Sequence, residues 1–312
     1  NSKESDRQAI QDEIDQLTTE IDRVAETTKF NEIYLLKGDS NGGTKNVFMK
    51  GHDAGLKGTL TDSAKTATFV MDDLKAGDKV TIAGKEYSIG STVADAKGSF
   101  AAAAKDEKVT VDGVEYTVAE NAGAADAGAN KIVLADIQAK VKAGSTVSYK
   151  GKDITAMNDD NNDGIDDDDS SVISKDVAET KITAELTAAN NIGTVDHAAT
   201  VAKTAANGKT TYTITKGYAT VADTLSFNLH VGADADMTNK ITVDIDTMNS
   251  ANLGIKGLNV TDATGTAATY AVDAISDAIA KVSSQRSALG AVQNRLEHTI
   301  DNLDNISENT SS

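Results

Sequence analysis

An acidic run at residues 158–169 offers the clearest pattern of metal-ligating side chains in this sequence. With Asp159 as position one, oxygen-bearing residues and the turn glycine Gly164 fall at the spacing of an EF-hand-type calcium loop. Alternate oxygens of such a loop converge on one cation. The predicted calcium ligands are Asp159, Asn161, Asp163, the backbone carbonyl of Ile165, and Asp167.

The match to a calcium loop is incomplete at its end. Position twelve is Ser170, where the pattern requires a bidentate Glu, so Asp168 or Asp169 would have to substitute. No amphipathic helices are predicted on either side. The alternative is a solvated acidic loop, because blocks of like charge are usually exposed. Both interpretations stay open, and calcium is the one cofactor that the sequence suggests.

Side chains for catalysis form no recognisable group. The four histidines are scattered at positions 52, 197, 230 and 298, and the chain has no HExxH, GxSxG or GxGxxG motif. Gly208-Lys209-Thr210 resembles the end of a phosphate-binding loop, but Lys203 stands where its first glycine should be. The sequence therefore predicts a protein that is not an enzyme.

Composition narrows the classes of partner. The 312 residues include 30 basic and 48 acidic side chains, a net charge of −18. General affinity for nucleic acid or anionic lipid needs basic patches, so neither is an expected partner. The apolar runs are too short to span a membrane. The chain has no Cys, which removes disulfides and zinc–thiolate sites, and no Pro.

Two rows of residues repeat every seventh position near the C-terminus. One row is Ile275, Val282, Leu289, Leu296 and Leu303, and the other is Val272, Ile279, Arg286, Gln293 and Ile300. The rows predict one helix from about residue 269 to residue 307 with a coiled-coil-like seam. It would be roughly 60 Å long, so an equally long partner should cover it. Arg286 and Gln293 either set the register of the seam or face solvent at its edge.

A second amphipathic helix is predicted near the N-terminus. Its apolar residues keep three- and four-residue spacing up to about residue 27; they are Ile10, Ile14, Leu17, Ile21 and Val24. This helix would be only about 35 Å long. Part of the C-terminal helix therefore has no evident partner in this chain, which implies a missing segment or a neighbouring subunit.

The middle of the chain is predicted to be rich in short strands. Val80–Ile89 recurs as Val109–Val118 and, more weakly, as Val147–Ile154. Each copy is a strand, a two-residue turn with Gly second, and a strand, which is the pattern of a β-hairpin. Residues 225–232 and 241–245 alternate as a further predicted hairpin.

Both ends of the chain resemble bacterial flagellin. Residues Gln285–Ile300 are similar to the C-terminal helix of that family almost residue for residue. Residues 14–31 resemble its second N-terminal helix and the turn that follows, and residues 229–233 and 253–255 also fit its pattern. The resemblance covers roughly 130 residues, which makes an inference of fold safe.

The resemblance implies a filament subunit truncated at both termini, without the terminal polymerisation helices, so this chain is not expected to form filaments alone. Implied partners are other flagellin subunits, an export chaperone, the filament cap and Toll-like receptor 5. The core of the receptor site lies on a helix that has no match here, so receptor binding should be weak or lost. Implied receptor or subunit contacts are Glu13, Arg286, Gln293, Asn294 and Arg295. Without the resemblance, Glu13 would be interpreted as a solvent-exposed charge on the helix.

The predicted fold is α+β and multidomain, with a long coiled-coil-like helical rod from both chain ends and a β-rich variable insert with hairpin repeats. Residues 1–43 and 224–312 form the rod, and residues 44–223 form the insert, which could divide into two subdomains. The predicted function is a structural subunit of the bacterial flagellar filament, secreted to the cell exterior. The rival is a calcium-dependent binding or adhesin-like module displayed on the filament.

Overall fold

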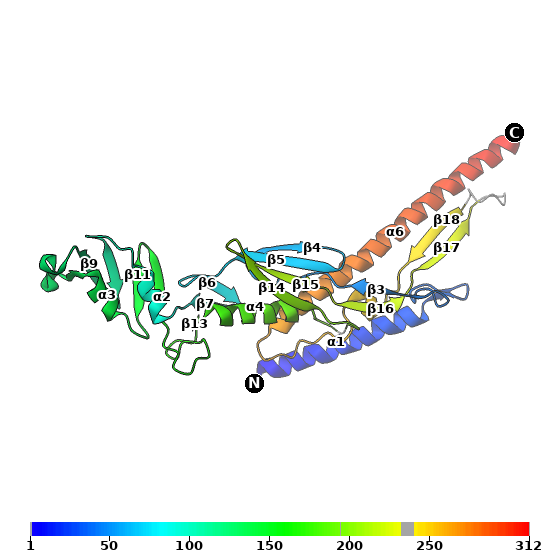
Figure 1. The fold of residues 1–312 in the computed structure, drawn as a ribbon. Coiled ribbons are helices and arrows are strands. Elements are labelled where there is room, and N and C mark those ends of the chain that lie inside the picture. The colour runs from blue at the N-terminus through cyan, green and yellow to red at the C-terminus, as the bar shows by residue number, and fades with distance from the viewer. Residues whose placement is uncertain (1, 194, 232–239, 312) are drawn as a thin grey trace.

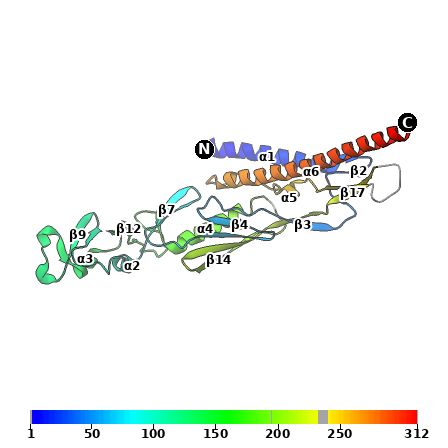
Figure 2. The same ribbon diagram turned by 90° about the horizontal axis from the view of Figure 1, so that it is seen from above.

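The computed structural model of the chain describes residues 2–193, 195–231 and 240–311. The molecule is elongated, with two long terminal helices and a series of sheets that extends away from them (Figures 1 and 2). Helices and strands are both abundant, as the predicted α+β class requires. The α-helices are α1 (Ser2–Thr27), α2 (Val93–Gly98), α3 (Leu134–Lys140), α4 (Lys175–Ala189), α5 (Ser250–Leu253) and α6 (Thr266–Ser311).

The two long helices come from opposite ends of the sequence. Helix α6 has 46 residues, which at 1.5 Å per residue gives about 70 Å. Helix α1 is much shorter, as its apolar spacing predicts. Between the helices lies the segment 253–260, whose Leu253 and Leu258 share a core with Ala274 of α6 and with Ile14 of α1. The helices are therefore joined through this segment rather than by the heptad rows.

Polar side chains of α1 hold this intervening segment in place. The Gln11 amide is buried, and it donates to the carbonyl of Leu258 and accepts from the N–H of Val260, both at 2.8 Å. The Asp22 carboxylate accepts from the N–H and the hydroxyl of Ser250, also at 2.8 Å, and so holds the start of α5, which leads into this segment.

The segments that lead from the rod into the insert are short antiparallel pairs. The pairs are β1 (Lys29–Phe30) with β2 (Ile33–Tyr34), β3 (Thr44–Phe48) with β16 (Tyr218–Ala222), and β17 (Leu225–His230) with β18 (Lys240–Ile245). The last pair confirms the hairpin predicted between residues 225 and 245. Gly232 and Ala233, which belong to the predicted strand, lie outside the described residues.

The part of the insert next to the rod is called the proximal module here. It has a four-stranded antiparallel sheet in the order β14-β15-β5-β4 and a three-stranded sheet in the order β13-β7-β6. Helix α4 packs Ile182 and Leu186 into a core with Phe69 and Tyr212. The strands are β4 (Thr59–Asp62), β5 (Thr66–Asp72), β6 (Lys79–Ile82), β7 (Lys85–Ile89), β13 (Val172–Ile173), β14 (Thr200–Ala206) and β15 (Lys209–Thr215).

The distal module lies farther from the rod and has its own core. One five-stranded sheet in the order β10-β9-β8-β11-β12 packs against α2 and α3 through Phe100, Val109, Ile137 and Val147. Two short 3-10 turns, Ala122–Ala124 and Ala127–Ala129, precede β10. The strands are β8 (Lys108–Val111), β9 (Val114–Ala119), β10 (Lys131–Val133), β11 (Thr146–Tyr149) and β12 (Lys152–Thr155).

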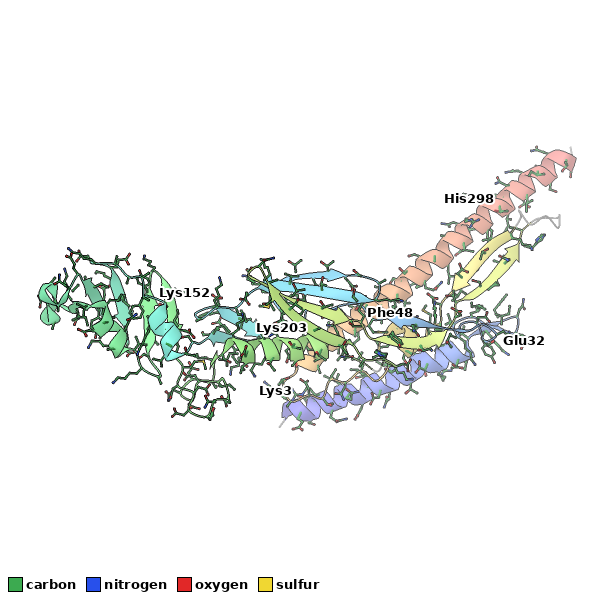
Figure 3. All side chains as sticks on the ribbon, viewed as in Figure 1. Lys3, Glu32, Phe48, Lys152, Lys203 and His298 are labelled. Atoms are coloured by element: carbon green, nitrogen blue, oxygen red, sulfur yellow. The ribbon has the colours of Figure 1, made fainter. Side chains whose placement is uncertain are left out.

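Labelled side chains in Figure 3 show how these parts follow one another along the molecule. Lys152 marks the distal module, Lys203 the proximal module and His298 the far half of α6 (Figure 3). The boundaries predicted for the rod and the insert, at residues 43/44 and 223/224, stay a prediction.

Candidate interaction surface

Large apolar side chains are exposed along α6. Val272 is 65% exposed, and Ile279 and Ile306 are both 61% exposed. The side chains that α6 buries are on another face, and apart from Tyr270 they are small: Ala271, Ala274 and Ala278. The exposure of these residues leaves the coiled-coil-like seam unconfirmed within this chain. A coiled-coil-like seam with another chain or segment stays a prediction.

The far half of α6 projects from the body of the molecule (Figure 1). Every described residue from 301 to 311 is exposed, including Leu303 and Ile306. Contiguous exposed apolar side chains on a soluble protein mark a surface that another partner covers. The exposure of these side chains makes α6 a candidate interaction surface.

The contact residues implied by the resemblance all lie at the surface. Glu13 is exposed on α1, while Arg286, Gln293, Asn294 and Arg295 are exposed on α6. Gln293 donates to the Glu297 carboxylate at 3.2 Å, one turn farther along the same helix. Arg286 and Gln293 are exposed in this chain, but so are Val272 and Ile279 of the same row, so both interpretations of these polar residues stay predictions. Their roles as contacts stay a prediction.

The predicted calcium loop is held together by its own backbone N–H groups. Asp159 accepts from the N–H of Asp163 and of Gly164, both at 3.0 Å, and Gly164 has a φ of 76°. Asn161 also accepts from the N–H of Asp163 at 3.0 Å, and Asp167 accepts from the amide of Asn161 at 3.2 Å. Gly164 permits this turn because it lacks a Cβ.

The arrangement of these side chains does not fit a metal site as it stands. Within the described ranges, no group of three or more His, Asp or Glu side chains is placed so that it could hold a metal ion. The Asp163 Oδ1 atom accepts from the N–H of Ile165 at 2.8 Å, so this predicted ligand oxygen already makes a hydrogen bond within the loop. Calcium would have to draw the oxygens toward a shared centre, and its binding stays a prediction.

The loop is anchored by a residue that the sequence pattern did not single out. Asp166 is only 5% exposed and accepts from the N–H groups of Asn158, Asp168 and Asp169, all at 2.9 Å. Asp166 falls between the ligand positions of the calcium pattern, so the pattern assigns it no role.

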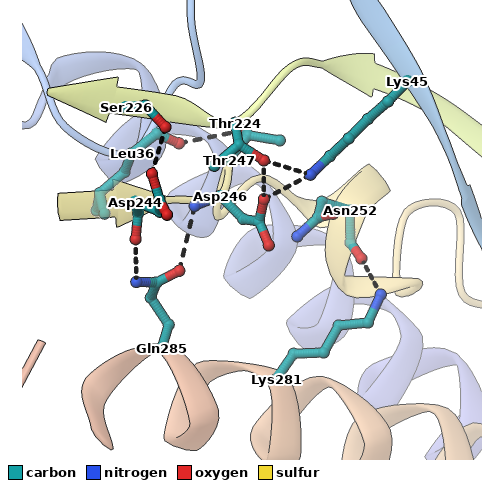
Figure 4. A network of polar contacts seen from close by, with 10 residues as sticks. All are labelled: Leu36, Lys45, Thr224, Ser226, Asp244, Asp246, Thr247, Asn252, Lys281 and Gln285. Carbon is teal, nitrogen blue, oxygen red and sulfur yellow. Dashed lines mark hydrogen bonds and ion pairs between the residues drawn. The ribbon is translucent and has the colours of Figure 1, made fainter. Parts of the chain in front are cut away.

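A polar junction joins the rod to the base of the insert (Figure 4). Lys45 of β3 donates to Asp246 at 2.5 Å and to the hydroxyl of Thr224 at 2.7 Å. On α6, Gln285 accepts from the N–H of Asp246 at 3.1 Å and donates to the carbonyl of Asp244 at 3.0 Å. These contacts fix β3 and the end of β18 to α6.

Burial and charge act against each other at this junction. Burial works to raise the pKa of Asp246, but hydrogen bonds from Lys45 and Thr224 and the charge of Lys45 lower it below its ordinary value. Burial lowers the pKa of the Lys281 ammonium, which the charges of Asp246 and Asp277 partly oppose. Lys281 donates to the carbonyl of Asn252 at 2.6 Å.

Two further contacts tie the insert to α6. His52 lies 2.9 Å from Asp277 through its Nε2 atom, and the Tyr270 hydroxyl donates to Glu185 of α4. No motif in the sequence singled out these residues or those of the polar junction. One signal was present, because Lys281 and Gln285 continue the helical spacing of the buried alanines 274 and 278.

The described helices include none with both the length and the hydropathy needed to cross a membrane.

The comparisons with known proteins concern these same helices. Residues 1–41 match the family model described as the bacterial flagellin N-terminal helical region, and residues 272–312 match the bacterial flagellin C-terminal helical region. Both ends of the chain are flagellin-like. The matches confirm the resemblance inferred from residues 14–31 and 285–300, and the second one covers the exposed rows of α6.

Similar proteins carry related names. A putative flagellin of Bacillus subtilis, YvzB, is 49% identical over 87 residues, which are 28% of this chain and 53% of that protein. A flagellin of Clostridium tyrobutyricum is 27% identical over 321 residues, covering 99% of this chain and 62% of that protein. The flagellar filament 31.3 kDa core protein of Treponema maltophilum is 36% identical over 86 residues, covering 26% of this chain and 29% of that protein.

The chain covers less than two thirds of the length of each of these relatives. The strongest similarity is confined to short regions of roughly a quarter of the chain, while the match over nearly the whole chain is weaker. The truncation expected at both termini stays a prediction.

Proposed function

We propose that this chain is a structural subunit of the bacterial flagellar filament, located outside the cell. The observation that carries the proposal is the exposed apolar face of α6 within residues 272–312, the region that matches the flagellin C-terminal helical region. Burying one large apolar side chain stabilises an assembly by roughly 1.5–3 kcal/mol. A helix that leaves Val272, Ile279 and Ile300 in water therefore gains from packing against a neighbour.

The modules of the insert support the same proposal by their position. They extend from the rod, away from the free half of α6 (Figure 1). A filament whose subunits pack through the rod would leave this β-rich insert at its outer surface. The hairpin repeats then belong to the displayed part and the coiled-coil-like rows to the packed part.

Further partners belong to the same proposal and rest on the resemblance. They are an export chaperone, the filament cap and Toll-like receptor 5. The exposure of Glu13 on α1 and of Arg295 on α6 leaves both side chains accessible to a partner.

Electron microscopy of the encoding bacterium tests the filament proposal. An antibody raised against the isolated insert should label filaments along their whole length, and deletion of the gene should remove both the label and the filaments that carry it. Label confined to the cell body, with filaments unchanged in the deletion strain, would show that the chain is not a filament subunit.

A further inference from the structure

Three hairpins of equal length recur within the insert, at residues 77–89, 106–118 and 144–156. In each, the first residue donates its N–H to the last, and the last donates to the second. The first-to-last distances are 2.7 Å for Gly77 to Ile89, 2.9 Å for Asp106 to Val118 and 2.7 Å for Gly144 to Ala156. Each hairpin turns through two residues of positive φ, the second a glycine, at residues 83–84, 112–113 and 150–151.

Each hairpin also pairs with a segment that leads into a helix, here called its arm. The last hairpin residue pairs in parallel with a residue two positions before the first residue of a helix. The pairs are Ile89 with Ile173 before α4, Val118 with Ile132 before α3, and Ala156 with Ser91 before α2. At the same position of each helix, one residue is fully buried: Ala178, Ile137 and Ala96, all 0% exposed.

The middle hairpin pairs with the arm that follows it directly in the chain, β10–α3. The other two hairpins do not. The first hairpin, β6–β7, takes β13–α4, which follows the third hairpin in the chain. The third hairpin, β11–β12, takes the arm at residues 91–98, which follows the first hairpin.

We propose that the insert consists of three copies of one hairpin–strand–helix unit, and that the first and third copies have exchanged arms to form a clasp between the two modules. The exchange places an arm from each side of the module boundary in the core of the other side. Opening the distal core frees the arm at residues 91–98, which continues directly into the first hairpin. The two modules should therefore unfold as one unit. This inference does not depend on the filament role.

Gly90 marks the point where the exchanged strands cross. Its N–H donates to Ile173 at 2.9 Å, and the adjacent N–H of Ser91 donates to Thr155 at 2.9 Å. A Cβ at position 90 would lie 2.3 Å from the Met157 side chain and 2.9 Å from that of Val172. The two crossing strands are in contact there, and only glycine leaves room for both.

Hydrogen exchange of the full chain, read by mass spectrometry as a function of denaturant, tests the clasp. In the wild-type chain, amides of the distal strands β8 and β11 and of the proximal strands β7 and β13 should open with one common free energy and denaturant dependence. Two distinct values, with the distal strands opening first, would overturn the proposal.

A core variant of the distal module gives the second readout. Ile137→Ala touches only the distal core and should reduce protection there by roughly 30-fold or more. The clasp predicts an equal loss in β7 and β13, whereas the exposed neighbour variant Asp136→Ala should leave both modules at wild-type protection. A loss confined to the distal module contradicts the clasp. If Ile137→Ala does not fold, hydrogen exchange of the wild-type chain still shows whether the two modules open together.

Discussion

Single carboxylates in the insert take on structural roles that depend on the hydrogen bonds around them. The Tyr149 hydroxyl donates to Glu107 at 2.6 Å, the Ala104 N–H donates to it at 2.9 Å, and Lys150 lies 3.0 Å away. These contacts lower the pKa of Glu107 from its ordinary 4.5 to about 2. The charged form of Glu107 is thus the one that the distal module stabilises.

Acid should weaken the distal module through this residue. Because the folded pKa of Glu107 lies below the unfolded one, its contribution to stability is complete above pH 4.5 and is lost as the pH falls toward 2. We expect Glu107→Gln to flatten the loss of stability between pH 4.5 and pH 2, measured by urea unfolding at each pH. Glu86→Gln, which changes an exposed carboxylate of the first hairpin, is the control. An unchanged pH profile in Glu107→Gln would refute this role.

The calcium prediction for the acidic loop has a direct test. If the loop binds calcium, a calcium concentration 100 times the dissociation constant would add about 2.7 kcal/mol to the free energy of unfolding. A thermal melt resolves a change of this size. The prediction expects this gain in the wild-type chain and its loss in Asp163→Ala, with the gain retained in Asp160→Ala, whose side chain falls outside the ligand positions. Identical melts in calcium and in chelator would contradict the calcium prediction.

At the scale of whole elements, the rod depends on the buried contacts of α1 with the segment 253–260. We expect Gln11→Ala to cost roughly 1–3 kcal/mol, because it leaves the Leu258 carbonyl and the Val260 N–H without their buried partner. Urea unfolding measures the loss, and the exposed Gln16→Ala should stay within about 0.5 kcal/mol of the wild type. Equal stabilities of the two variants would show that this contact does not hold the rod together.

Sequence periodicity predicted the elements of the rod better than their packing. Heptad spacing was enough to predict α6, and the alternation of residues 225–232 and 241–245 was enough to predict the hairpin of β17 and β18. The heptad rows did not indicate the face that α6 buries within the chain, because Ala271, Ala274 and Ala278 are small and add little to an apolar pattern. These alanines pack against the segment 253–260, and this contact forms only when the chain folds.

The residues of the candidate site likewise divide into those that the sequence indicated and those that only the fold reveals. Exposed contacts such as Glu13 and Arg295 came from the resemblance, since no spacing rule distinguishes them from other surface charges. The pair of Lys45 and Asp246 links positions 201 residues apart, a relation that local spacing does not contain. The acidic loop was visible as a pattern, but the role of Asp166 depends on burial, which only the fold reveals.

At the scale of the molecule, the chain is a rod with an exposed apolar face on α6 and two modules that extend from it. In the proposed filament a neighbouring subunit covers that face. Apart from Tyr270, the side chains of α6 that the chain buries are small, and large apolar side chains such as Val272 and Ile279 are left on the exposed face. Substitutions on this face should therefore leave the isolated chain intact and affect only assembly. Substitutions of the buried alanines should unfold the rod.

The most direct test introduces Ile279→Asp and Ile300→Asp together into the gene of the encoding bacterium and measures filament length by electron microscopy. We predict secreted, folded subunits and few or no filaments, because two charges then lie on the face that neighbours cover. The control is Asn302→Asp, which adds charge at an exposed polar position of α6 and should leave filaments unchanged. Filaments of normal length in the double variant would contradict the account.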